Sequence, residues 1–162
     1  MTEHLRKYKQ DKRLPPSWKS LEVVSLGTLS KLYSNLKRSV AEKDVIATEL
    51  GLPTQDVLEN WLLSITSLRN VAAHHGRLFQ RTLGTNFRTP FPTLPGRWID
   101  LSTVRPKSVY ANLSRMAYIL QFVSPGNRFS LRLWELFQKY PSVRFKEVGF
   151  PANWRGQGLW RL

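Results

Sequence analysis

The sequence, 162 residues long, contains no cysteine. This absence excludes disulfide frameworks, zinc–thiolate sites, iron–sulfur clusters and cysteine nucleophiles, and it fits a reducing compartment. The sequence also lacks any run close to the roughly 18 apolar residues that span a bilayer, and its first residues are charged where a signal peptide is apolar. We therefore expect a cytoplasmic protein without a membrane partner.

Acidic residues are also scarce. The chain has 25 Lys and Arg against 11 Asp and Glu, a formal net charge of +14 and a pI near 10.7. Residues 60–134 contain ten basic residues, nine of them arginine, and a single acid, Asp100. Because guanidinium groups bind phosphate through two parallel hydrogen bonds, this excess predicts a nucleic-acid partner. A basic surface that only keeps the protein in solution is the alternative.

Apolar spacing, prolines and glycines together predict one all-α domain over residues 1–162. Five segments show helical periodicity and are punctuated by capping residues, glycines and prolines. Residues 82–107 contain four prolines and two glycines, which exclude a helix and predict a long loop. Residues 1–16, which end in Pro15-Pro16, are expected to be an extended or frayed lead-in. The expected helices cover residues 17–38, 41–50, 55–81, 109–123 and 130–140.

The tail beyond residue 140 is rich in aromatic side chains, namely Phe145, Phe150, Trp154 and Trp160. A free tail rarely carries so much apolar surface, so we expect it to be clamped on the core. Stacking of these rings on nucleic-acid bases is the alternative.

The chain contains three histidines, and two of them are adjacent within the predicted helix 55–81. Neighbouring residues on a helix point about 100° apart, so His74 and His75 cannot bind one metal ion from one face. With no cysteine and few carboxylates nearby, we expect no metal site and no cofactor. On a helical wheel His75 faces the apolar side with Leu68 and Trp61, which is typical of a structural core histidine.

The opposite side of this wheel is polar and basic. His74 lies about 140° from Arg69 and shares this side with Asn70, Arg77, Arg81 and Thr66. RNA cleavage through the 2′-hydroxyl needs a base, an acid and cations for the pentavalent phosphate, and these residue types supply them without a metal. From the pattern alone, an exposed face of solvated arginines with an incidental histidine is the favoured interpretation. Arg69, at the boundary, could also lay its stem along the core.

Residues 67–81, SLRNVAAHHGRLFQR, contain Arg-Asn-x-x-x-His followed by a second His and by x-Arg-Leu. In this pattern the chain resembles bacterial abortive-infection (Abi) proteins of the AbiD/AbiF type, a branch of the HEPN superfamily. Arg-x4-His alone occurs by chance, whereas four motifs in the family's order form a specific signal. The other three are LPPSWKSLEVVSLGTLSKLYSNLK at 14–37, VLENWLLS at 57–64, and GFPANW with the later LW at 149–160.

The resemblance implies a HEPN-like helical bundle and a metal-independent endoribonuclease site that is completed across a homodimer. Carried over to this chain, Arg69 would stabilise the scissile phosphate, His74 would act as general base or acid, and Asn70 would orient the phosphate or His74. Arg77 would be a supporting phosphate ligand. Its position on the helical wheel supports this role more strongly than the family motif does. Cleavage is expected to leave a 2′,3′-cyclic phosphate, in a phage-defence or toxin–antitoxin-like system.

The expected partners are RNA, a second copy of the chain, and an antitoxin that is a protein or a small RNA. Arg81 and Arg88 are also expected to contact the RNA. Many HEPN proteins are inactive, so a non-catalytic RNA-binding or antitoxin-binding module is the alternative. A DNA-binding regulator is a third and less favoured interpretation, because the sequence does not show the spacing of a helix-turn-helix motif. Family members are usually longer, and the first helix here resembles the middle of their sequence. We therefore expect incompletely covered apolar faces, which favour dimerisation, a partner chain or a truncated, inactive product.

Overall fold

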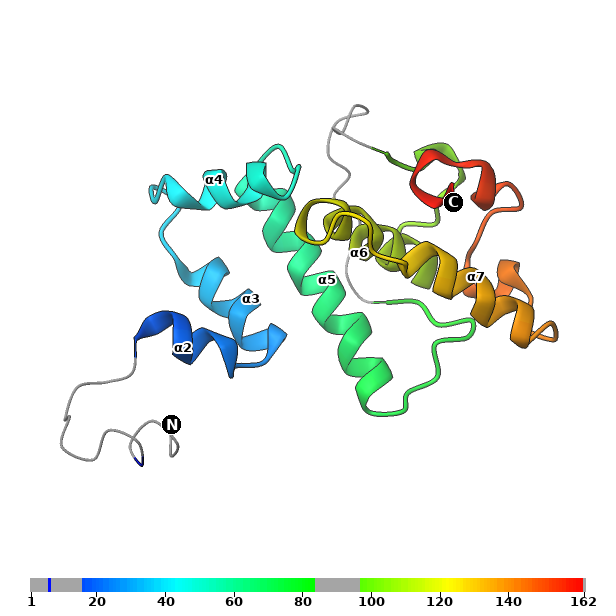
Figure 1. The fold of residues 1–162 in the computed structure, drawn as a ribbon, viewed down its shortest axis with the longest axis horizontal. Coiled ribbons are helices and arrows are strands. Elements are labelled where there is room, and N and C mark those ends of the chain that lie inside the picture. The colour runs from blue at the N-terminus through cyan, green and yellow to red at the C-terminus, as the bar shows by residue number, and fades with distance from the viewer. Residues whose placement is uncertain (1–5, 7–15, 84–96, 162) are drawn as a thin grey trace.

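A computed structural model of the protein describes residue 6 and residues 16–83 and 97–161 (Figure 1). Regular structure in these ranges is entirely helical, which confirms the predicted all-α class. None of the helices described is long and apolar enough to cross a membrane. The α-helices are α2 (Ser17–Glu22), α3 (Leu26–Asn35), α4 (Glu42–Glu49), α5 (Gln55–Ala73), α6 (Val109–Val123) and α7 (Phe129–Lys139). Short 3-10 turns lie between α5 and α6 at η1 (Leu101–Thr103), and after α7 at η2 (Phe145–Val148), η3 (Trp154–Gly156) and η4 (Gly158–Trp160).

The central element is α5, around which the other helices are arranged. In Figure 1, α3 and α4 lie on one side of α5, and α6 lies on the other with α7 beyond it. Thr54 precedes α5 in an extended conformation, but its side chain makes no capping hydrogen bond. The cap comes instead from α4, because Asp44 Oδ1 accepts from Gln55 N at 2.9 Å. The start of α5 is therefore fixed by a tertiary contact.

An aromatic core fills the space between α5, α6 and the chain that returns to α6. Trp61 is fully buried and stacks on Trp98, with 5.3 Å between the ring centroids. Tyr118 meets Trp61 edge-on at 5.5 Å, and its hydroxyl donates to Gly51 O at 2.7 Å. Gly51 follows α4 with a φ of +72°, as expected for a glycine that ends a helix. These contacts join α4, α5 and α6 through rings that are far apart in the sequence.

The single helix predicted at 17–38 is wrong, because the segment forms two helices separated at residues 23–25. Ser25 is extended, and its Oγ accepts from Thr28 N at 3.1 Å. A serine in this position satisfies a free N–H at the start of a new helix, so it interrupts an apolar stripe that is otherwise periodic. The shorter predicted helices are confirmed to within one residue at each end: 41–50, 109–123 and 130–140.

The C-terminal tail is clamped on the core, as predicted. Its rings at Phe150, Trp154 and Trp160 are each 3% exposed or less, so protein covers the surfaces that base stacking would need. Gln157 fixes the tail, because its Oε1 accepts from Tyr110 Oη at 2.9 Å and from Asp100 N at 3.1 Å. Of the predicted loop 82–107, residues 84–96 lie outside the described residues, as does most of the predicted lead-in.

Candidate functional site

The candidate site is at the C-terminal end of α5, and the helix ends before His74 rather than at the predicted residue 81. Two backbone hydrogen bonds close the chain at this point. His75 N donates to Ala72 O at 3.1 Å, and Gly76 N donates to Val71 O at 2.7 Å. This pair of bonds is the Schellman motif, which satisfies the last free carbonyls and terminates the helix.

The backbone after His74 is unusual in two respects. His75 has a φ of +53°, a left-handed conformation that few residues other than glycine adopt. At Gly76, a Cβ would lie 2.8 Å from Val71 Cγ1 and from Val71 O, so the close approach needs a glycine. Gly76 was therefore the sequence signal for the end of the helix, because glycine next to the last apolar residues is typical of a C-terminus.

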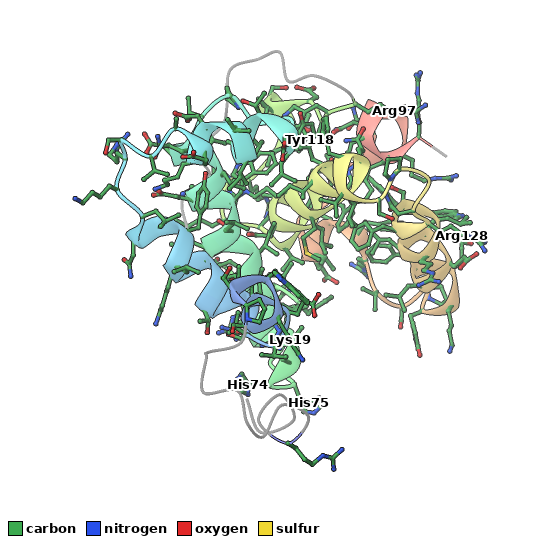
Figure 2. All side chains as sticks on the ribbon, turned by 60° about the vertical axis from the view of Figure 1, so that its left-hand side comes forward. Lys19, His74, His75, Arg97, Tyr118 and Arg128 are labelled. Carbon is green, nitrogen blue, oxygen red and sulfur yellow. The ribbon has the colours of Figure 1, made fainter. Side chains whose placement is uncertain are left out.

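Arg69, Asn70 and His74 lie at the C-terminal end of α5, and we call this group the α5 cluster. Arg69 Nη1 donates to Asn70 Oδ1 at 3.1 Å. Asn70 and His74 are one helical turn apart, which makes them neighbours on the helix surface. All three side chains are exposed, and Figure 2 shows His74 at the tip of α5, away from the body of the bundle. The cluster therefore presents a guanidinium, an amide and an imidazole to solvent.

The prediction that His75 faces the core is wrong, because its side chain is exposed. The wheel assumed a helical period through residue 81, whereas the left-handed backbone at His75 turns the chain out of the helix. In Figure 2 the two imidazoles lie apart at the tip of α5. Within the described ranges, no group of three or more histidine, aspartate or glutamate side chains is placed to hold a metal ion.

The other residues on the polar side of the wheel do not join the α5 cluster on that face. The guanidinium of Arg77 lies over the ring of Phe79, 5.5 Å from its centroid. Arg81 lines a cavity beside the start of α6. Thr66 is buried, and a Cβ at Gly27 of α3 would lie 3.3 Å from its methyl group, so α3 covers this part of α5. Arg88 lies outside the described residues.

The positive charge of residues 60–134 is not all at the surface, which the sequence did not indicate. Arg115 of α6 is fully buried, and its Nη1 donates to Asn112 Oδ1 at 3.1 Å. Burial lowers the pKa of Arg115 to about 10, because the charged form loses its hydration. The side chain of Arg115 is therefore buried inside the helical bundle and is not available to contact a phosphate at the surface.

Comparison with known protein families gives a match over part of the chain. Residues 1–80 match the family described as Abi-like protein. The matched segment contains α2 to α5 and the whole α5 cluster, and it ends one residue before Arg81. No curated protein and no solved structure matches the chain. The first 80 residues, just under half of the chain, are thus similar to the Abi-like protein family.

Proposed function

We propose that this protein is a metal-independent endoribonuclease of a phage-defence or toxin–antitoxin-like system, built on a HEPN-like bundle. The match to Abi-like proteins supports a role in abortive infection. The chemistry is carried by one observation: Arg69 is hydrogen-bonded to Asn70, and both side chains and that of His74 are exposed at the C-terminal end of α5, inside the matched segment. These side chains can bind a phosphate and move a proton without a metal.

The proposed reaction is attack of an RNA 2′-hydroxyl on the adjacent phosphorus. Neutral His74 takes the proton of the 2′-hydroxyl as the new bond between the 2′-oxygen and phosphorus forms. The bond between phosphorus and the 5′-oxygen breaks, and an acid gives a proton to the departing oxygen. The products are a 2′,3′-cyclic phosphate and a 5′-hydroxyl. Arg69, held by Asn70, would stabilise the added negative charge of the pentavalent phosphate.

A second copy of the chain is part of the proposal. Arg69 and His74 are five residues apart, so their side chains leave the helix about 140° apart. The reaction also needs an acid besides the base, and the same histidine of a second copy would supply it. Exposed apolar side chains on and next to α2 and α3 support an interface, since Trp18 is 63% exposed and Val23 76%.

Cleavage of a labelled, mixed-sequence RNA in the presence of EDTA tests the proposal. We expect His74→Ala and Arg69→Ala each to lower the cleavage rate by about 100-fold or more. His75→Asn is the matched control, because asparagine tolerates the left-handed backbone and only the neighbouring imidazole is removed. Its rate should stay near that of the wild type, and the wild-type products should carry cyclic phosphate ends.

A non-catalytic RNA-binding or antitoxin-binding module is the second candidate. The exposure of the whole α5 cluster favours it, because a catalytic group usually works in a site from which water is partly excluded. Wild-type protein that binds the RNA but does not cleave it in EDTA would support this candidate. Cleavage by His74→Ala at the wild-type rate would remove the proposed site.

A further inference from the structure

A basic cavity of 760 Å³ lies away from the α5 cluster, between the chain that follows α5, the start of α6 and the segment around η2. We call it the basic groove. Five of its lining residues are cationic and one is acidic, Glu147. The cationic residues are Arg81, Arg105, Lys107, Arg144 and Lys146. Four of these five were not singled out from the sequence, because they come from three separate segments.

The charge of the basic groove is not neutralised by its own walls. All five cationic side chains are exposed, and none forms a salt bridge with another residue that the structure describes. The groove also contains Ser108, the capping residue of α6. The positive end of the helix dipole of α6 therefore adds to the potential there. A groove with a net excess of four formal positive charges favours a polyanion.

The walls of the groove are held by backbone contacts rather than by flexible side chains. Gln80 N donates to Glu147 O at 2.9 Å, and Leu83 N donates to Lys107 O at 2.9 Å. Leu83 is 2% exposed and packs beside Val109 in a small apolar cluster beneath the groove. Arg81 and its neighbours are thus anchored on both sides, and a ligand would meet a formed surface.

A second cavity of 1010 Å³ extends the groove. It shares Arg105, Arg144 and Lys146 with the first cavity and continues towards α7 and η3. There the guanidinium of Arg155 lies 3.7 Å from the ring centroid of Trp134. The cations therefore follow a continuous hollow, as a chain of phosphates would require.

We propose that the basic groove binds the phosphate backbone of single-stranded RNA and holds it for the α5 cluster. Arginine forks match phosphate oxygens, and three of the five groove cations are arginine. Hollows of this size admit a few nucleotides. The groove is also within reach of the α5 cluster, because Arg81 is seven positions after His74 and an extended chain of that length spans at most about 25 Å. Only the delivery to the α5 cluster rests on the proposed function.

The test measures binding of a fluorescein-labelled, mixed-sequence 12-nucleotide RNA by anisotropy over a range of salt. Every 2′-hydroxyl of the probe is methylated, so that no cleavage can occur. The groove variant combines Arg81→Gln, Arg144→Gln and Lys146→Gln. For single strands each phosphate contact contributes about 0.7 to the slope of log K against log salt. The variant should therefore lose about 2 from the slope and about 100-fold in affinity at 0.1 M salt.

The matched control removes three exposed cations that do not line the groove: Lys31→Gln, Lys37→Gln and Arg132→Gln. It changes the net charge by the same amount, and its affinity and slope should stay near those of the wild type. Equal losses in the two variants would overturn the groove and leave only a net-charge effect. A 12-residue glutamate peptide that competes as well as RNA would overturn the choice of RNA and indicate an acidic protein partner.

The result separates this inference from the proposed function. A chain that never cleaves RNA but loses affinity only in the groove variant supports the groove and contradicts the nuclease. A chain that cleaves RNA while the groove variant binds like the wild type supports the nuclease and contradicts the groove. If both hold, the groove variant should raise KM for a cleavable RNA and leave kcat within about twofold.

Discussion

Substitution of Gly149 by alanine tests how the wall of the basic groove is built. Gly149 has a φ of +90°, and a Cβ on it would lie 2.5 Å from Ser108 Cβ. Ser108 cannot easily give way, because it caps α6 through a 3.1 Å hydrogen bond from Ala111 N to its Oγ. We therefore expect Gly149→Ala to push η2 away from the start of α6 and to destabilise the fold.

Two costs set the size of this effect. An alanine in the left-handed region costs about 1–2 kcal/mol. Overlap with an atom fixed to the backbone costs about 1–3 kcal/mol, because the backbone itself must move. The free energy of unfolding should fall by about 3 kcal/mol in total. For a chain of this size that corresponds to a decrease in Tm of about 9 °C.

The measurement is thermal unfolding followed by circular dichroism, with Gly126→Ala as the matched control. Gly126 has a similar φ of +81°, but no atom lies within 4 Å of a Cβ placed on it. This control should therefore show only the backbone cost of about 1–2 kcal/mol and a decrease of about 4 °C. A Gly149→Ala protein that melts no lower than Gly126→Ala would refute the argument from close packing.

Two further predictions concern buried groups. Glu59→Gln should lower the free energy of unfolding by about 3–5 kcal/mol, because Lys43, whose side chain is 1% exposed, would keep a buried charge without its anion. Asp56→Asn, which breaks the exposed pair with Arg38, should lower the free energy of unfolding by no more than about 1 kcal/mol. Equal losses of unfolding free energy in the two variants, measured by urea unfolding, would contradict the role of burial. The free energy of unfolding should also fall as the pH rises from about 10 to 12, because burial raises the pKa of three tyrosines from 10 to about 12. Each neutral phenol contributes its full stability below pH 10, and the unfolded chain is stabilised when its own phenols ionise. The sequence has five tyrosines, so the argument for Tyr33, Tyr110 and Tyr118 would be disproved if the phenolate absorbance of all five developed near pH 10 in the folded protein.

Much of the fold was predictable because its signals are local. The helix at 109–123 starts at a capping serine and carries an apolar stripe, and the structure places Ser108 as its cap. Gly51 was predictable as a helix end for the same reason, since only its own backbone conformation is involved. The clamped tail followed from its aromatic content, although the hydrogen bonds of Gln157 that fix it were not visible in the sequence.

The candidate site was predictable only in part. Arg69 and Asn70 lie within α5, and His74 directly follows its last residue, so the three positions are local in the sequence and the prediction could name them together. The wheel failed beyond His74, because a Schellman turn replaces the helix and sends Arg81 into the basic groove. The groove itself depends on three segments, the outer two of which, at Arg81 and Arg144, are 63 positions apart. No periodicity within one segment could indicate it.

The contact between Gln157 and Asp100 affects the order in which parts of the chain fold during synthesis. The hydrogen bond joins residues 57 positions apart, and the rings of the tail complete a core that α5 and α6 begin. During synthesis the tail leaves the ribosome after every segment it packs against, and contacts of such long range form late in folding. The groove wall at residues 144–149 belongs to the same late segment. A nascent chain therefore exposes the α5 cluster well before the walls of the basic groove are complete.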